Sequence, residues 1–207
     1  MIMSENIKRI LIYITGVFMI SLGIIIFLEC RLGSDPITVI LDGLSNTFKV
    51  RYSTSSLMYN TTLLITCFIF SRKHIGAGTI FYLLAISFFI NLSENLLAFM
   101  NITDMSIYSK IPLLIVGQII LSAGMSLVVV ANIGKNSLDG IIFKIEELTK
   151  QNYMTIRTTI DIMYTIIGFL LGGVVGLGTV FSALTTGWMM KNFINIFNKS
   201  FNLIESN

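Results

Sequence analysis

Long apolar stretches separated by short polar segments make up most of this chain. Residues 10–28 and 111–133, for example, carry no charged side chain. About 20 apolar residues in a helix cross a bilayer, whereas barrel strands alternate apolar and polar positions in short segments. The pattern therefore predicts six membrane-spanning helices, at about residues 10–28, 54–70, 79–97, 111–131, 155–171 and 179–196.

The same arrangement of glycines occurs twice. Gly16, Gly23 and Gly33 are followed, at identical spacing, by Gly117, Gly124 and Gly134. This repeat divides one membrane domain, residues 1–207, into copies at 10–99 and 111–199 with three spans each. Because three is odd, the second copy enters the membrane from the opposite side. The predicted fold is an all-α polytopic membrane protein with two inverted three-helix repeats.

The basic residues set the predicted orientation. With six spans and the N-terminus inside, ten Lys and Arg residues fall on the inner side and four on the outer side (Arg31, Lys49, Arg51 and Lys110). Cytoplasmic loops carry such an excess of positive charge. We therefore expect a multi-pass protein of the bacterial plasma membrane with both termini in the cytoplasm.

A short amphipathic helix is predicted after the first span of each copy. In the first copy Ser34 or Asp35 can cap this helix, and Pro36 fits its first position. In the second copy Asn136 or Ser137 takes the capping position. The two helices either lie at the membrane surface or fold back as half-helices whose first amides face a central site. Charges in the second helix favour the surface, and the first leaves both interpretations open.

A Gly-x-Gly-Thr element precedes the last span of each copy, at Gly76, Gly78 and Thr79 and at Gly176, Gly178 and Thr179. We interpret it as a tight connector with close helix packing. A phosphate-binding loop would need a lysine partner and a βαβ context, which the sequence lacks.

Polar residues inside the predicted spans are the next candidates, because they are costly in lipid. Asn60 and Asp161 occupy equivalent places in the two copies. Arg157 lies four residues before Asp161, so pairing on one helix face is favoured over ion coupling. Asp35 and Asp42 are seven residues apart and can share a face.

No catalytic residues, metal site or cofactor are predicted. The single histidine, His74, lies in a basic loop, and Cys30 and Cys67 lack metal-binding spacing. No pair of nucleophile and base stands out. We therefore expect a protein that is not an enzyme.

Composition agrees with a membrane protein: 54% of residues are hydrophobic and 12% are charged. The net charge is +3, and the basic residues lie mostly at the ends of the predicted spans, so this charge does not predict nucleic-acid binding. The expected partner is the lipid bilayer, with a small solute besides. Small residues in the spans also permit a homodimer or another membrane protein partner.

Three segments resemble the YczE/YyaS/YitT family of bacterial integral membrane proteins, and most closely its YczE branch. They are Leu32-Gly33-Ser34-Asp35-Pro36, Asp42-Gly43-Leu44-Ser45 and Gly176-Leu177-Gly178-Thr179, the last together with Ala183-Leu184 and Gly187. The resemblance covers nearly the whole chain and implies a small multi-span plasma-membrane protein without an assigned general activity. The chain departs from the family pattern at Ile37 and Thr38, where an aromatic residue and an acid are frequent, and at Trp188, where a proline is frequent.

Three functional hypotheses follow. The first is a transporter or permease that binds a small solute between the inverted repeats. The second is a non-transporting accessory or regulatory protein for a membrane-associated enzyme. The third, a membrane enzyme acting on lipid, lacks an acid/base or metal set. The candidate substrate-binding residues are Gly33, Asp35, Pro36, Asp42, Asn60, Gly134, Asn136, Asp139 and Asp161.

Overall fold

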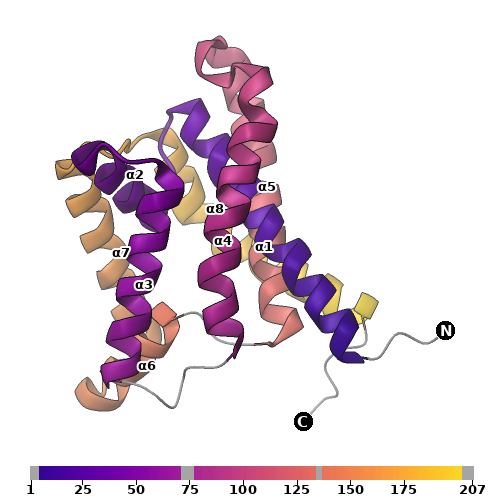
Figure 1. Ribbon diagram of the computed structural model, residues 1–207, viewed down its shortest axis with the longest axis vertical. Coiled ribbons are helices and arrows are strands. Elements are labelled where there is room, and N and C mark those ends of the chain that lie inside the picture. Colours follow the sequence, from indigo (N-terminus) through magenta and orange to yellow (C-terminus); the bar gives the residue numbers. More distant parts are fainter. Residues whose placement is uncertain (1–4, 71–76, 134–136, 202–207) are drawn as a thin grey trace. The chain divides into compact units, whose positions relative to one another are not determined.

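The computed structural model describes residues 5–70, 77–133 and 137–201, with the backbone only of residues 77, 78 and 139. The all-helical prediction is confirmed over this part of the chain (Figure 1). Its elements are α1 (Glu5–Cys30), α2 (Pro36–Phe48), α3 (Tyr52–Phe70), α4 (Ala77–Leu97), the 3-10 helices η2 (Ala98–Met100) and η3 (Ile102–Asp104), α5 (Ile107–Ala131), α6 (Ser137–Thr149), α7 (Tyr153–Leu170) and α8 (Leu177–Phe201).

Membrane-compatible helices are present among these elements. By length and apolar composition, three described stretches can cross a membrane: Glu5–Cys30, Thr79–Met100 and Ile107–Ala131. The helices α3, α7 and α8 are 19, 18 and 25 residues long but more polar on average. The two short helices, α2 and α6, have 13 residues each, which is too few to span a bilayer.

Helix boundaries recur along the chain at an interval of 101 residues. The short helix α2 begins at Pro36 and ends at Phe48, and α6 begins at Ser137 and ends at Thr149. Left-handed backbone recurs at the same interval, at Arg31 and Asn132 and again at Lys49 and Lys150. Residues other than glycine seldom adopt this conformation, so its recurrence shows that the two copies share local backbone structure as well as sequence pattern.

The chain forms two compact units, and each unit draws on both halves of the sequence. Unit 1 contains 1–34, 88–133 and 176–207, and unit 2 contains 35–87 and 134–175. The helix α4 contributes its first half to unit 2 and its second half to unit 1. The units therefore do not coincide with the two sequence copies.

In unit 1, α1 and α5 cross at glycines. A Cβ atom on Gly124 would lie 2.7 Å from the carbonyl oxygen of Gly16, and one on Gly117 would lie 3.7 Å from that of Gly23. Later positions on α1 thus meet earlier positions on α5, so the two helices run antiparallel. Glycine at these positions lets the backbones approach, as small residues do in membrane helix pairs.

Buried polar side chains attach α8 to α5 in the same unit. Gln118 Nε2 donates a hydrogen bond to Thr186 Oγ1 at 2.8 Å, and Ser126 Oγ donates to the Met190 carbonyl oxygen at 3.3 Å. Gln118 and Ser126 are fully buried. Hydrogen bonds between helices of this kind add to close packing where no water is present.

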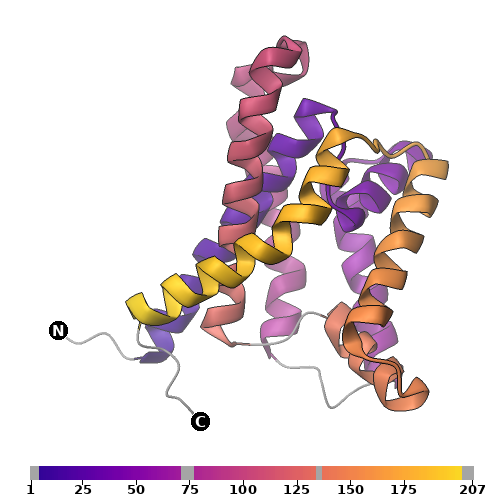
Figure 2. The ribbon, with the colours of Figure 1, turned by 180° about the vertical axis from the view of Figure 1, so that it is seen from behind.

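In unit 2, each short helix packs against a long helix from the other half of the chain: α2 against α7, and α6 against α3. Leu138 and Ile142 of α6 and Ile156 of α7 form a buried core. Both ribbon views show α2 at one end of the α3 and α7 pair and α6 at the other end (Figures 1 and 2). The two short helices therefore lie at opposite ends of one helix pair.

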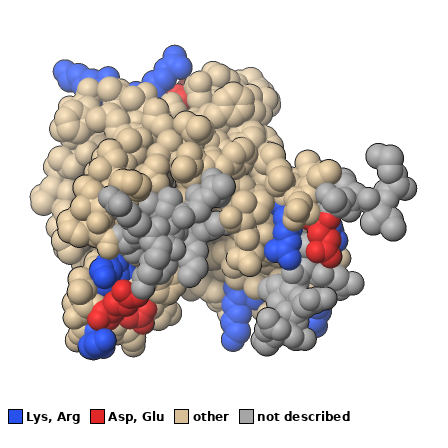
Figure 3. Space-filling view, turned by 60° about the horizontal axis from the view of Figure 1, so that its bottom comes forward, with Lys and Arg blue, Asp and Glu red and all other residues tan. Residues whose placement is uncertain are grey.

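The outer face of α6 is polar, as its sequence predicts. Lys144 Nζ lies 3.5 Å from Glu147 Oε2, and both side chains are partly exposed. Figure 3 shows basic and acidic side chains side by side at one corner of the drawn face, whereas most of that face carries no charge. An apolar face packed in unit 2 and a charged face outside it account for the amphipathic pattern of this helix.

Candidate functional site

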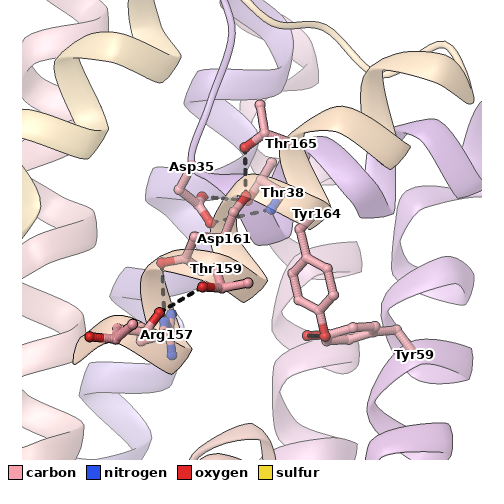
Figure 4. Close-up of polar contacts among 9 residues, drawn as sticks. Asp35, Thr38, Tyr59, Arg157, Thr159, Asp161, Tyr164 and Thr165 are labelled. Atoms are coloured by element: carbon pink, nitrogen blue, oxygen red, sulfur yellow. Dashed lines mark hydrogen bonds and ion pairs between the residues drawn. The ribbon is translucent and has the colours of Figure 1, made fainter. Parts of the chain in front are cut away.

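Asp35 caps the first turn of α2. Its Oδ2 atom accepts a hydrogen bond from the Thr38 amide at 3.2 Å, and its Oδ1 atom accepts one from Thr38 Oγ1 at 2.6 Å. Pro36, which has no amide hydrogen to satisfy, takes the first helical position. Figure 4 shows the Asp35 carboxylate turned toward Thr38. The positive end of the α2 dipole is thus already compensated by a carboxylate of the chain itself.

Asp42 and its neighbours on α2 bind the segment that follows α7. Asp42 Oδ2 accepts a hydrogen bond from the Val174 amide at 3.0 Å. Asn46 Nδ2 donates to the Gly172 carbonyl oxygen at 2.8 Å, and Thr47 Oγ1 donates to that of Leu171 at 3.1 Å. Asp42, a candidate binding residue from the sequence, therefore has a positioning role within unit 2.

Glycines set the distance between α2 and α7. A Cβ atom on Gly168 would lie 2.7 Å from the Ile40 backbone, and one on Gly43 would lie 2.5 Å from the Gly168 carbonyl oxygen. At Gly173 a Cβ atom would lie 2.3 Å from the Val39 carbonyl oxygen. Real Cβ atoms do not come this close, so the three glycines allow a close approach that larger residues would prevent.

Tyr52, the first residue of α3, carries a buried hydroxyl. The side chain is 8% exposed. Asp35, Asp42 and Tyr82 are near enough to act on this hydroxyl electrostatically, and the Thr38 hydroxyl is its hydrogen-bonding neighbour. The Tyr52 hydroxyl therefore belongs to the polar contacts at the start of α2.

The face of α3 that contains Tyr52 is polar for its first two turns. Ser55, Ser56 and Asn60 follow at helical spacing and are buried, with Ser55 and Ser56 each 1% exposed. Asn60 Nδ2 donates to the Ser56 carbonyl oxygen at 2.8 Å, whereas Ser55 Oγ has no hydrogen-bond partner in the described chain. The sequence analysis singled out Asn60 of this face but missed Tyr52, Ser55 and Ser56.

Two further contacts lie deeper along the helices of unit 2. Arg157 Nε lies 3.2 Å from Asp161 Oδ2, so the pair expected from the sequence is formed on α7. Tyr59 Oη donates a hydrogen bond to Tyr164 Oη at 3.2 Å, and their rings meet edge to face. Figure 4 shows the two hydroxyls pointing toward each other between α3 and α7.

The Gly-x-Gly-Thr element of the second copy lies in unit 1, where it contacts the segment after α1. The Gly178 amide donates to the Leu32 carbonyl oxygen at 2.7 Å, and the Gly176 amide donates to Thr179 Oγ1 at 3.3 Å. Gly33 has a φ of +91°, and a Cβ atom on it would lie 2.4 Å from the Gly176 nitrogen. Here the glycines form a tight connection between two turns.

The candidate residues are thus divided between the two units. Asp35, Pro36, Asp42, Asn60 and Asp161 lie in unit 2, and Gly33 lies in unit 1 with the second Gly-x-Gly-Thr element. In the first such element, Thr79 is buried in the first turn of α4. Gly76, Gly134 and Asn136 are outside the described residues, and Gly78 and Asp139 are described by their backbone alone.

Of these candidates, the structure groups Asp35 and Asp42 with Thr38 and Tyr52. No set of three or more His, Cys, Asp or Glu side chains in the described part of the chain could hold a metal ion. We call these four residues, Asp35, Thr38, Asp42 and Tyr52, the polar cluster of unit 2. Its chemistry is that of oxygen atoms: two carboxylates and two hydroxyls.

Comparison with known proteins places this architecture in a family. The chain belongs to the family of unknown function DUF6198, whose model matches residues 7–195. It is 26% identical over 196 residues to an uncharacterised protein of Haemophilus influenzae, an alignment that covers 91% of this chain and 84% of the relative. It is 23% identical over 193 residues to the uncharacterised protein YyaS of Bacillus subtilis, covering 91% and 94%. No solved structure matches.

The similarity to YyaS agrees with the resemblance indicated by the segment around Gly33 and Asp35. These relatives carry no assigned activity, so they bring no substrate to this chain.

Proposed function

We propose that this protein is a transporter of the bacterial plasma membrane that moves a small solute. In this proposal the helices α1, α3, α4, α5, α7 and α8 cross the bilayer as two inverted repeats. Both termini face the cytoplasm, in keeping with ten basic residues on the inner side against four on the outer side.

The observation that carries the proposal is the crossing of α1 and α5. Gly16 and Gly117 are equivalent in the repeat, and so are Gly23 and Gly124. At the crossing, Gly16 meets Gly124 and Gly117 meets Gly23. When equivalent positions exchange partners across an antiparallel pair, the two helices are related by a two-fold axis. Inverted repeats in secondary transporters have such an axis in the membrane plane.

The packing of unit 2 supports the same symmetry. The short helix of each copy packs against the second long helix of the other copy, and the two short helices lie at opposite ends of that pair. A two-fold axis would convert one of these contacts into the other. Transporters with inverted repeats rock one repeat or bundle against the other, which opens the binding site to the two sides of the membrane in turn.

Buried polar side chains support transport over a purely structural role. Thr38, Tyr52, Ser55 and Asn60 are each at most 8% exposed. Polar groups at membrane depth are costly and usually face a solute path or the protein interior. Ser55 Oγ makes no hydrogen bond in the described residues, so internal pairing does not explain all four.

The test is solute flux in proteoliposomes. We would screen a panel of labelled small solutes with wild type, Asp35→Asn and the control Gly187→Ala, whose added methyl group meets nothing within 4 Å. We expect uptake of at least one solute, at the same rate in wild type and the control. In Asp35→Asn this uptake should be at least about tenfold slower, which corresponds to an increase of about 1.4 kcal/mol in the activation free energy.

No uptake above empty liposomes across the panel would contradict the proposal. In that case, repeated co-purification of one membrane-associated enzyme in mild detergent would support the accessory role instead.

A further inference from the structure

Glu94 lies on the half of α4 that belongs to unit 1, outside the polar cluster of unit 2. Its side chain is half-buried, and its Oε2 atom is buried without a hydrogen-bond partner in the described part of the chain. A buried carboxylate oxygen without a partner costs free energy, because it has lost its water and gained no bond in return. The Glu94 carboxylate therefore lacks a partner that the described residues do not supply.

A hydrogen bond between α1 and α4 fixes the depth of Glu94. The hydroxyls of Ser21 and Ser93 are bonded to each other at 2.9 Å, and both side chains are fully buried. The uncharged stretch of α1 runs from residue 10 to residue 28, so its middle is Met19, two residues before Ser21. At about 1.5 Å per residue, Ser21 is about 3 Å from that middle. Glu94, which follows Ser93, therefore lies near the centre of the span of α1.

A second contact marks the edge of the membrane on the same two elements. Thr103 Oγ1, in the 3-10 helix η3 that follows α4, donates a hydrogen bond to Glu29 Oε2 at the end of α1. Glu29 is eight residues beyond Ser21, or about 12 Å along the helix. The hydrocarbon core is about 30 Å thick and extends about 15 Å on each side of its centre. Glu29 is thus at the membrane edge, whereas Glu94 is about 12 Å deeper.

The part of α1 that lies beside Glu94 carries no charge. The rings of Phe18 and Phe89 meet with their centroids 5.5 Å apart, so α1 follows α4 at this depth. The nearest titratable side chains on α1 are Tyr13 and Glu29, each eight residues from the bonded serine of α1. Both are about 12 Å along the helix from the level of Glu94.

The neighbouring helices add no positive charge at this level. On α4 itself the other titratable side chain is Tyr82, twelve residues before Glu94. The helix α5 packs against α1 and has no charged or titratable side chain from residue 111 to residue 133. An ion pair within these helices therefore does not neutralise Glu94.

Lys191 is the basic residue of unit 1 that lies inside a predicted span, and the helix register separates it from Glu94. The residue before Lys191 accepts a hydrogen bond from Ser126 of α5 through its carbonyl oxygen. Ser126 follows Gly124, which meets Gly16 of α1. The level of Glu94 is at least five residues further along α1, which corresponds to about 7 Å or more.

Among the possible partners of Glu94, a proton needs the fewest further ligands. A metal ion requires several oxygen ligands, but α4 has no second carboxylate and the α1 stretch beside it has none. A single carboxyl group binds a proton by itself, and the product is an uncharged O–H donor. An isolated carboxylate in an apolar medium is far more costly than this neutral form.

We propose that Glu94 is a proton-binding site inside the membrane. Its carboxyl group takes up a proton from water and holds it near the centre of the bilayer. Ionisable residues at this depth mark ion pathways and proton relays in membrane proteins. The use of this proton to drive solute movement rests on the proposed function above, whereas the presence of the site does not.

Reaction with a hydrophobic carbodiimide tests the site directly. Dicyclohexylcarbodiimide enters the membrane and adds to a protonated carboxyl group. The carboxyl proton moves to a carbodiimide nitrogen, and the carboxyl oxygen bonds to the central carbon. The resulting O-acylisourea rearranges to a stable N-acylurea, which mass spectrometry of peptides can locate. Membranes containing the protein would be treated over a series of pH values.

We expect an N-acylurea on Glu94 whose yield falls at least about tenfold from the lowest to the highest pH, because only the protonated group reacts and its fraction decreases as pH rises. Glu94→Gln should remove this adduct. The substitution keeps the shape of the side chain and breaks no bond of Oε2 within the described chain, so the variant should fold. If it does not fold, the position of the adduct on the wild-type peptide still decides the question.

Glu29 is the matched control. It is also a glutamate of unit 1, but it lies at the membrane edge and its carboxylate is bonded to Thr103. A water-soluble carbodiimide with glycine ethyl ester should modify Glu29 and leave Glu94 unmodified. Dicyclohexylcarbodiimide should modify Glu94 and leave Glu29 unmodified.

The absence of an adduct on Glu94 at every pH would overturn the inference, as would an adduct whose yield does not depend on pH. Equal modification of Glu94 and Glu29 by the water-soluble reagent would also overturn it, because Glu94 would then lie in water. The outcome is separable from the transport proposal. An adduct without solute flux would leave the proton site and remove its coupling role, whereas solute flux without an adduct would leave transport and remove the site.

Discussion

At the scale of single residues, glycine determines which helices of unit 1 can touch. Gly124 on α5 lies so close to α1 that a Cβ atom would stand 2.7 Å from both the Gly16 carbonyl oxygen and the Ile20 nitrogen. Both neighbours are backbone atoms, which cannot rotate away as a side chain can. A methyl group at this position therefore has to push the two helices apart.

We expect Gly124→Ala to lower the free energy of unfolding by about 1–3 kcal/mol, the usual cost of overpacking. Gly187→Ala on α8 is the matched control, because its methyl group meets open space and alanine favours a helix by up to about 1 kcal/mol. Unfolding of both variants in the same detergent gives the comparison. Equal stability of the two would show that α1 and α5 do not cross at this glycine.

The cap of α2 gives a second prediction at this scale. Asp35→Ala removes both hydrogen bonds to Thr38 and should destabilise the protein by about 0.5–2 kcal/mol, whereas Asp35→Asn should cost little because Asn also caps helices. Chemical or thermal unfolding of the two variants in the same detergent measures this difference. If Asp35→Asn were as unstable as Asp35→Ala, the charge of Asp35 and not its capping oxygen would hold the helix.

At the scale of elements, α2 organises unit 2, because it contacts α3, α7 and the segment after α7. Three of its side chains, Asp42, Asn46 and Thr47, bind the backbone of residues 171–174. The Val174 amide depends on a single carboxylate oxygen for its partner. We therefore expect residues 171–174 to stay ordered only when residue 42 has a side-chain oxygen that can accept this hydrogen bond.

Amide hydrogen exchange tests this dependence. In Asp42→Ala the amides of residues 171–175 should exchange about tenfold faster or more, because a lost hydrogen bond of about 1 kcal/mol or more lowers the cost of local opening. Asp42→Asn retains an acceptor oxygen and should exchange at nearly the wild-type rate. Unchanged protection in Asp42→Ala would mean that Asn46 and Thr47 hold the segment without it.

Some of these elements follow from the sequence and others do not. The start of α2 is predictable because Asp35 and Pro36 satisfy local rules for a helix N-terminus. The bond from Val174 to Asp42 spans 132 residues, so no local pattern can reveal it. Of the polar face at Tyr52, Ser56 and Asn60, which lie four residues apart, the sequence analysis singled out Asn60 alone, because averaging hydropathy over a whole span conceals one polar stripe.

At the scale of the whole molecule, the central claim is that the two halves enter the membrane in opposite directions. The glycine repeat and the recurrence of left-handed backbone at Lys49 and Lys150 support equivalent local structures in the two halves. The exchange of partners between α1 and α5 supports a two-fold axis. An inverted repeat adds one requirement: equivalent residues after the two short helices must lie on opposite sides of the bilayer.

Labelling of cysteines introduced at positions 49 and 150 measures most directly on which side of the bilayer each residue lies. Both residues are exposed, and the two native cysteines, Cys30 and Cys67, are buried and can be replaced in the background. A membrane-impermeant maleimide should label Lys49→Cys in intact cells and should label Lys150→Cys only after the membrane is permeabilised. Labelling of both positions from the same side would contradict the inverted repeat and the transport proposal built on it.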